Sequence, residues 1–233
     1  DTTMSIWNDI WELFFPRYCV VCSRRLLRGE THLCLSCLNK MPRTGMHLQV
    51  DNAMEKNLWG KFALGKATAF MYYAKDNDVQ KILYALKYYG DSNLGIFLGR
   101  LMAAELQPSG FFQGIDCIIP VPLHERKKRK RGYNQSEMLA SGLADVTGIP
   151  VFKHLIVRDQ YTETQTRKGR FERWMNVQDV FSCPFPEELE GKHILLVDDV
   201  MTTGATLVSC ADSLSGIPRL RISVLTLALA GGI

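Results

Sequence analysis

The stretch that decides the fold is Lys192-His193-Ile194-Leu195-Leu196-Val197-Asp198-Asp199-Val200-Met201-Thr202-Thr203-Gly204-Ala205-Thr206-Leu207. It contains a short apolar run, Ile194 to Val197, which is typical of a strand buried on both faces of a parallel sheet. Two carboxylates follow at the C-terminal end of this strand, where open α/β sheets place their ligands. Small residues then lead into a segment of helical character, residues 205–215. We therefore expect a strand, a turn and a helix, with a ligand site at the turn.

The turn, Thr202 to Thr206, has the composition of a phosphate cradle. Glycine lets the backbone approach an anion closely, and N–H groups at a helix start bind phosphate oxygens together with threonine hydroxyls. Neighbouring carboxylates repel a bare anion, so they call for neutral donors such as ribose hydroxyls, with a magnesium ion to offset charge. The pattern therefore indicates a sugar phosphate. An ordinary strand, turn and capped helix is the alternative, although turn chemistry alone does not require paired acids and three threonines.

Strands alternate with helices over most of the chain, which predicts an α/β fold with a mostly parallel sheet flanked by helices. The expected strands are residues 68–73, 115–121, 151–157, 194–197 and 221–230, and the expected helices are residues 79–88, 94–106, 136–147 and 205–215. A length of 233 residues suits one such domain with a small appendage. Because regular apolar spacing lapses between Met41 and Lys61, we divide the chain into an N-terminal region, residues 1–50, and the α/β domain, residues 60–233.

The composition places the protein in a class. An apolar content of 46% and a charged content of 22% are typical of a soluble globular protein. No apolar run is long enough to span a membrane. The first twenty residues lack a basic start followed by an apolar stretch and a cleavage site, so we expect a cytoplasmic protein. The net charge of +4 permits polyanion binding without requiring it.

Four of the seven cysteines form two knuckles, Cys19-x-x-Cys22 and Cys34-x-x-Cys37, separated by eleven residues. A two-residue gap lets both thiolates of a knuckle bind one metal, and two knuckles complete a tetrahedral site. Because four thiolates leave no open position, we expect a structural zinc ion. The alternatives are a redox pair, an iron–sulfur cluster and disulfides, the last of which a reducing cytoplasm disfavours.

Six apolar residues between Ile6 and Phe15 recur at helical spacing ahead of the knuckles, and Pro16 ends the pattern. We expect an amphipathic helix that docks on the chain's own domains; a subunit or partner contact is the alternative. Acidic residues on its opposite face, Asp9 and Glu12, argue against a membrane surface.

A basic run, Arg126 to Arg131, follows the expected strand of residues 115–121. We interpret it as part of a loop that opens at the same sheet edge as residues 198–206, where its cations neutralise a diphosphate. Six consecutive cations exceed what one diphosphate needs. A second interpretation is therefore single-stranded nucleic acid, with Tyr133 available for stacking, and a third is a solvated charge run.

The long polar segment from Arg158 to Asn176 shows no apolar period. Segments of this size are often lids or ligand loops, because packed domains rarely keep them otherwise. A disordered surface loop is the alternative.

Residues 194–206 resemble the phosphoribosyl-diphosphate (PRPP) motif of type I phosphoribosyltransferases, with four apolar residues, two acids, two apolar residues and Thr-Thr-Gly-Ala-Thr. The resemblance implies that Asp198 and Asp199 bind the ribose 2′- and 3′-hydroxyls and that Thr202 to Thr206 bind the 5′-phosphate. It also implies that the basic loop binds the diphosphate and that a mobile loop covers the reacting sugar and excludes water.

Further segments make the resemblance narrower. They are the four cysteines, Leu86-Lys87-Tyr88-Tyr89-Gly90-Asp91, Pro120-Val121-Pro122-Leu123, Arg131-Gly132-Tyr133-Asn134-Gln135 and Thr162-x-x-Gln165. Together they resemble the competence protein F (ComF) family over nearly the whole chain. This resemblance implies a role in the uptake or handling of transforming DNA, with a helicase-like or recombination-mediator protein as partner. Members of that family are often labelled phosphoribosyltransferases on sequence similarity.

The candidate residues fall into four groups. They are Asp198, Asp199, Thr202, Thr203, Gly204, Ala205 and Thr206 for ribose and 5′-phosphate; Pro122, Leu123, His124, Arg126, Arg129, Arg131 and Gly132 for diphosphate or another polyanion; Arg158, Thr162, Gln165, Arg173 and Asn176 for the mobile loop; and Cys19, Cys22, Cys34 and Cys37 for zinc.

The chemistry expected of an enzyme is displacement of diphosphate from C1 of PRPP, with Mg²⁺. Asp198 and Asp199 orient the ribose and Arg131 neutralises the leaving group. The sequence does not name the acceptor. The alternatives are a non-catalytic module that binds single-stranded DNA and a protein partner, and a PRPP-responsive regulator.

Overall fold

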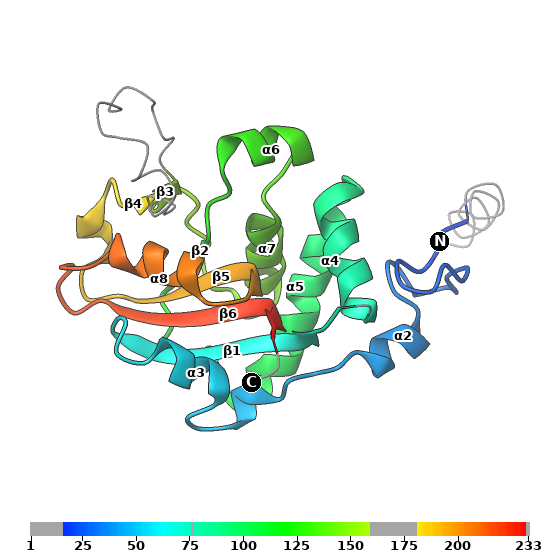
Figure 1. The fold of residues 1–233 in the computed structure, drawn as a ribbon, viewed down its shortest axis with the longest axis horizontal. Coiled ribbons are helices and arrows are strands. Elements are labelled where there is room, and N and C mark those ends of the chain that lie inside the picture. The colour runs from blue at the N-terminus through cyan, green and yellow to red at the C-terminus, as the bar shows by residue number, and fades with distance from the viewer. Residues whose placement is uncertain (1–15, 76, 159–180, 232–233) are drawn as a thin grey trace, which may run out of the picture.

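The computed structural model describes residues 16–75, 77–158 and 181–231 (Figure 1). Its main sheet contains β1 (Leu64–Tyr73), β2 (Cys117–Pro120), β5 (His193–Met201) and β6 (Arg221–Ala230), in the order β1-β6-β5-β2. All pairings within this sheet are parallel. A separate antiparallel pair consists of β3 (Val157–Arg158) and β4 (Phe181–Ser182). The predicted α/β fold with a mostly parallel sheet is therefore confirmed.

Strand β5 is buried on both faces, as its apolar run predicts. Ile194 to Val197 are all fully buried. Leu195 and Val197 belong to one hydrophobic cluster and Ile194 and Leu196 to another, because successive side chains of a strand point to opposite faces. The sheet consequently requires helices on both sides.

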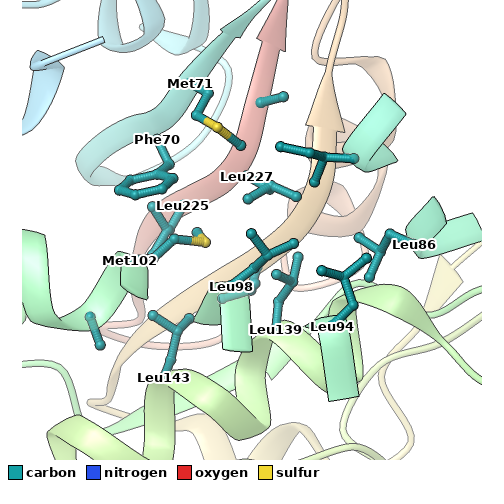
Figure 2. Packing of buried hydrophobic residues seen from close by; sticks show 14 of the residues in the cluster. Phe70, Met71, Leu86, Leu94, Leu98, Met102, Leu139, Leu143, Leu225 and Leu227 are labelled. Atoms are coloured by element: carbon teal, nitrogen blue, oxygen red, sulfur yellow. The ribbon is translucent and has the colours of Figure 1, made fainter. Parts of the chain in front are cut away.

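Three helices cover one face: α4 (Asp78–Tyr88), α5 (Ser92–Leu106) and α7 (Gln135–Thr147). Figure 2 shows part of this core, with Leu86, Leu94, Leu98, Met102, Leu139 and Leu143 of these helices gathered against Leu225 and Leu227 of β6. Helices α5 and α7 approach closely because glycines face each other at their crossing. An added Cβ at Gly99 would lie 3.0 Å from the Cα of Gly142.

The other face is covered by α3 (Ala53–Leu58) and α8 (Ala205–Asp212), through Met54, Leu58, Leu207 and Cys210. The remaining elements are α2 (Leu35–Lys40), α6 (Glu125–Arg131) and the 3₁₀ turns η1 (Met46–Leu48), η2 (Gln107–Ser109) and η5 (Pro186–Leu189). The described part of the chain contains no helix with the length and apolar character needed to cross a membrane.

Two predictions about local structure are wrong. Residues 151–157 do not form a strand, since Val151 makes a single parallel bridge with Ile118 and only Val157 enters a strand. The basic run is not a loop but helix α6. Its N-cap is His124, whose Nδ1 accepts a hydrogen bond from the Arg126 N–H at 3.1 Å, and Gly132 ends it with φ +83°.

Other predictions remain open. The amphipathic helix expected at residues 6–15 lies outside the described residues. The division into residues 1–50 and 60–233 stays a prediction.

The close crossing of α5 and α7 gives the first test. Gly142→Ala should destabilise the protein by roughly 2–3 kcal/mol, because the new methyl group would overlap the carbonyl oxygen of Ile96 and approach the Arg100 nitrogen to 2.8 Å. Urea unfolding measures the change. Ser141→Ala, one residue earlier, is the matched control and should change stability little; equal stability of the two variants would contradict the packing described here.

Candidate functional site

A polar cavity of about 280 Å³ opens where β2 and β5 end. Because the two strands are parallel neighbours, their C-terminal ends meet at one edge of the sheet. Helices α4, α6, α7 and α8 and strand β3 also contribute to the wall. The cavity, called the ribose-site cavity below after the role predicted for it from the sequence, is lined by Lys87, Val121, Pro122, Leu123, Lys127, Arg131, Asn134, Gln135, Ser136, Arg158, Asp198, Asp199, Val200, Thr202 and Thr206.

Many of the predicted site residues meet in this cavity. Those that line it are Asp198, Asp199, Thr202, Thr206, Pro122, Leu123, Arg131 and Arg158. Those described outside its lining are Thr203, Gly204, Ala205, His124, Arg126, Arg129 and Gly132. Thr162, Gln165, Arg173 and Asn176 lie outside the described residues. The roles assigned to all these residues stay predictions.

Asp198 is held inside the protein by donors on one of its oxygens. The hydroxyl of Ser136 donates to Oδ1 at 3.0 Å, and the backbone N–H of Asp199 donates to the same atom at 2.8 Å. Burial, followed by the adjacent Asp199 carboxylate, raises the pKa of Asp198 to about 7. Near neutral pH this carboxyl is therefore poised between its protonated and ionised forms.

Asp199 is balanced by a cation that the sequence did not single out. Its Oδ2 lies 3.0 Å from Nζ of Lys87, and the two side chains are 14% and 23% exposed. Lys87 lies in the last turn of α4. The only signal in the sequence was its place in the stretch from Leu86 to Asp91, which the family resemblance included without giving Lys87 a role.

Only some of the cations of helix α6 line the cavity. Lys127 and Arg131, four residues apart and so on one helical face, line the cavity. Arg126, Arg129 and Lys130 are exposed and lie outside the lining. The prediction of a loop could not separate the residues that line the cavity from those that do not, because the separation follows from the helical spacing of the side chains.

Gln135 is a further residue that sequence reasoning missed. Its Oε1 accepts a hydrogen bond from Nη1 of Arg131 at 2.9 Å, which fixes the guanidinium beside the cavity. The side chain is buried, and its Nε2 has no hydrogen-bond partner among the described residues. A buried donor in the wall of a polar cavity indicates a missing acceptor, such as a ligand oxygen or water.

The turn after β5 is open to solvent. Thr202, Thr203 and Ala205 are exposed, and Gly204 adopts φ +80° at the start of α8. A Cβ on Gly204 would contact Met201 at 3.1 Å and Leu58 at 3.3 Å, so glycine also allows the turn to pack on α3. An anion can therefore reach the surface of this turn, where the Ala205 N–H donates to Oγ1 of Thr203 at 3.4 Å.

Tyr133, predicted as a stacking residue, is partly buried. Its hydroxyl donates to the carbonyl of Leu86 at 2.6 Å, so the side chain braces the end of α4. Burial raises the pKa of Tyr133. Tyr84, Tyr88 and Tyr89, at the end of α4 that Tyr133 braces, are well exposed instead.

The four knuckle cysteines form a compact cluster with all Sγ atoms within 4.8 Å of one another. The Sγ atoms of Cys22 and Cys34 are 3.7 Å apart, close to the edge of about 3.8 Å that a tetrahedron with Zn–S bonds of about 2.3 Å requires. The described cysteines form no disulfide. The arrangement is compatible with a structural zinc ion.

Backbone donors favour the thiolate of Cys19, whereas burial and then the neighbouring cysteines raise the pKa of Cys37. The N–H of Cys34 donates to Sγ of Cys19 at 3.4 Å, and that of Cys37 donates to Sγ of Cys34 at 3.5 Å. Burial alone raises the pKa of Cys19, but hydrogen bonds from backbone N–H groups outweigh burial and lower it to about 7. Thiolates are the form that binds metal.

The cysteine segment packs against α4. Cys19, Val21 and Leu26 belong to the same buried cluster as Val79 and Leu83 of that helix. Lys81 of α4 also donates to the carbonyl of Val21 at 3.1 Å, and His32 lies 3.2 Å from Asp91, the N-cap of α5. The cysteine segment thereby supports the helix that carries Lys87.

Three curated proteins illustrate the relatives of the chain. DNA utilization protein YhgH of Shigella flexneri is 30% identical over 200 residues, which cover 84% of this chain and 83% of the relative. Competence protein ComFC of Bacillus subtilis is 32% identical over 200 residues, 78% of this chain and 77% of the relative. Competence protein F of Haemophilus influenzae is 37% identical over 93 residues, 40% and 41% of the two chains. No family model matches the chain.

Solved structures give weaker similarity. Glutamine phosphoribosylpyrophosphate amidotransferase from B. subtilis aligns with a TM-score of 0.42 at 20% identity, over 61% of this chain and 30% of that chain. Adenine phosphoribosyltransferase from Leishmania tarentolae aligns with a TM-score of 0.33 at 12% identity, over 80% and 94%. The fold described above therefore rests on strand order and pairing alone.

The cysteine cluster predicts one zinc ion per chain. Chelation, or Cys22→Ser, should remove the metal and lower the unfolding temperature by about 10 °C or more, because a structural zinc contributes several kcal/mol to folding. Elemental analysis and thermal unfolding measure both effects. Cys183→Ser, at a half-buried cysteine outside the cluster, should keep the metal. Unchanged metal content in Cys22→Ser would contradict the assignment.

Because the pKa of Asp198 is raised in the folded protein, ionised Asp198 should lower the free energy of unfolding. The folded protein keeps this proton up to about pH 7, whereas the unfolded chain releases it near pH 4. Wild-type stability therefore falls as pH rises from 4 to 7. Asp198→Asn, which retains an acceptor for Ser136, should be more stable by about 1–2 kcal/mol at pH 8 and by less at pH 5.

Thermal unfolding of the ligand-free protein at both pH values measures this difference. Asp212→Asn, at an exposed carboxyl on α8, is the control and should give no such gain at pH 8. A destabilised Asp198→Asn at pH 8 would argue against a strained carboxyl.

Proposed function

The chain belongs to the competence protein F family, and from that premise we propose that its ribose-site cavity binds PRPP with Mg²⁺ in a protein that handles transforming DNA. The names of the relatives, competence protein and DNA utilization protein, support the biological setting. The ligand is proposed on the chemistry of the cavity.

The observation that carries the proposal is the meeting of three kinds of group around one cavity. Two carboxylates, Asp198 and Asp199, stand beside the threonines of an open glycine turn, and cations face them from α4 and α6. Carboxylates suit ribose hydroxyls, the turn suits the 5′-phosphate, and Lys127 and Arg131 suit a diphosphate. PRPP carries ribose hydroxyls, a 5′-phosphate and a diphosphate, so it can contact all three kinds of protein group at once. A ligand with only one of these features would contact only one kind.

The charge state of the acid pair fits a hydroxyl-bearing ligand. Ribose hydroxyls donate to an ionised carboxylate, so Asp198 must lose its proton for the strongest binding. Below pH 7 that loss opposes binding, since the pKa of Asp198 is about 7. Affinity for PRPP should then weaken about tenfold between pH 8 and pH 6 if this carboxylate alone sets the dependence.

In a transfer reaction, the bond between C1 of the ribose and the diphosphate oxygen breaks while a bond to the acceptor forms. The diphosphate leaves with the bonding electrons, and positive charge develops on the ribose ring. Arg131 and Lys127 stabilise the departing charge, and Mg²⁺ supplies further neutralisation when bound with the diphosphate. The closing role of residues 158–176 remains a prediction, because Arg158 alone among them is described.

A second function has its own observation. Arg126, Arg129 and Lys130 are exposed on α6 and lie outside the lining of the ribose-site cavity. We therefore assign Arg126 and Arg129 to another polyanion and not to the diphosphate that the sequence also suggested for them. Such a cationic face suits the backbone of single-stranded DNA. The proposed partner remains a helicase-like or recombination-mediator protein, and the cytoplasmic location remains a prediction.

Calorimetry tests the ligand. The wild-type protein should bind PRPP with Mg²⁺, and the double substitution Asp198→Asn/Asp199→Asn should weaken binding at least about 100-fold, because each hydrogen bond to a charged group contributes about 1.5–3 kcal/mol. The double variant should stay folded, so its loss of binding would not reflect unfolding. Absence of a heat signal in the wild type would overturn the ligand assignment.

The exposed cations provide the matched control. Arg126→Ala/Arg129→Ala should leave PRPP binding unchanged and weaken binding to a single-stranded oligonucleotide, with a shallower dependence on salt. Diphosphate release from PRPP in the presence of candidate acceptors then decides whether the bound sugar turns over.

A further inference from the structure

A second cavity, of about 400 Å³, opens at the N-terminal ends of β1 and β6, whereas the ribose-site cavity lies where β2 and β5 end. The turn between η1 and α3 forms one wall, and Lys66, Phe111 and Arg221 also line the space. In Figure 1, α3 lies below β1, while α6 lies at the top of the view. No residue lines both cavities, so a role for this one is separate from the ligand proposed above.

Exposed apolar side chains line this second cavity. Val50 is 90% exposed and Leu48 is 73% exposed, the two highest values among the large apolar side chains of the described chain, and Trp59 is 51% exposed. All three residues belong to the lining. Single exposed apolar residues are normal on a protein surface, but three around one hollow are typical of a surface that another molecule covers. We call these residues, together with Asp51, Lys66 and Arg221 of the same lining, the η1–α3 patch.

The turn that carries Leu48 and Val50 is anchored at both ends. Met46 and Asn52 are buried, and Nδ2 of Asn52 donates to the carbonyl of Met46 at 3.3 Å. The same nitrogen donates to the carbonyl of Ala67 in β1 at 2.8 Å, and the side-chain oxygen of Asn52 caps α3 through two backbone N–H groups. Because the turn is fixed in this way, contact with a partner would require little ordering of its backbone.

Charged groups of both signs line the same cavity. Asp51 and Arg221 are exposed, and neither forms an ion pair with another described residue. Lys66 likewise has no carboxylate partner in the described ranges, since its Nζ donates to a backbone carbonyl at 3.1 Å. Glu55 is occupied by two backbone N–H groups, and burial lowers the pKa of His47, the remaining titratable group of the lining. The patch therefore offers one acid and two cations beside its apolar side chains.

We propose that a second copy of this chain docks on the η1–α3 patch, with the two copies related by a two-fold axis. A two-fold contact joins one surface to itself, so that surface must be complementary to itself. The patch meets this condition in shape, because it combines exposed apolar side chains with a hollow. It also meets the condition in charge, since Asp51 of each copy can pair with Arg221 of the other. A partner of a single charge sign would leave either Asp51 or Arg221 facing a like charge.

Sedimentation velocity over a range of protein concentrations tests the association. The average mass of the wild-type protein should rise with concentration from that of one chain toward twice that mass. Val50→Asp should weaken association about 100-fold or more, because it would bury an unpaired carboxylate in the contact. Leu27→Asp, at an exposed apolar residue outside the patch, is the matched control and should associate as the wild type does. A wild-type protein that stays monomeric up to about 100 μM, or equal loss in the control, overturns the proposal.

Exchange of the charges tests the two-fold pairing. Asp51→Arg alone and Arg221→Asp alone each place like charges at both ends of the contact, so each variant should be monomeric. An equimolar mixture of the two should form a heterodimer, because the introduced arginine faces the introduced aspartate and the native pair is restored at the other end. A mixture that stays monomeric, or single variants that associate as tightly as the wild type, would refute the pairing. Thermal unfolding checks that both variants are folded; if either is not, Val50→Asp decides.

The association does not rest on the proposed function, and the two fail separately. Because no residue lines both cavities, Val50→Asp should bind PRPP as the wild type does, whereas Asp198→Asn/Asp199→Asn should lose PRPP and still associate. Calorimetry and sedimentation of the same two variants measure both properties. Loss of association in the folded acid variant, whose patch is intact, would contradict docking at the patch.

Discussion

The parallel pairing of β5 with β2 is the constraint on which the rest of the structure depends. Residues Cys117–Pro120 pair with Ile194–Val197, and this register brings the segments that follow both strands to one sheet edge. Helix α6 and the acid pair are separated by more than sixty residues in sequence and face each other only for this reason.

The acid pair places two carboxylates side by side at this edge of the sheet, at a cost in stability. Adjacent carboxylates in a partly buried position repel each other. Two features reduce this repulsion: Asp198 keeps its proton up to about pH 7, and Asp199 forms an ion pair with Lys87. Both features are reversible, since a proton leaves and a lysine side chain moves. A hydrophobic substitute would pack better but could not accept hydroxyl hydrogen bonds, so the unfavourable charge is consistent with selection for binding.

The sequence predicts what local patterns determine. The buried strand at Ile194 to Val197 and the cysteine spacing each constrain structure within a short window. The burial of the strand and the clustering of the four cysteines are confirmed, whereas the zinc ion stays a prediction. Helix α6 was missed because six cations have no apolar period; its cap at His124 and the ion pair between Lys128 and Glu137, 3.2 Å apart, stabilise it instead. Lys87 and Gln135 were missed as site residues since only tertiary packing brings α4 and α7 to the edge of the sheet.

Helix α4 connects the parts of the molecule that otherwise look independent. The cysteine cluster packs on its N-terminal half through Val79 and Leu83, and Tyr133 braces its C-terminal end at Leu86. The same helix presents Lys87 to the ribose-site cavity. An error of one residue in the position of α4 would separate the lysine from Asp199, because helical side chains rotate by about 100° per residue. The cysteine segment therefore contacts neither Lys87 nor Asp199 but packs on the helix that carries Lys87 and the exposed tyrosines.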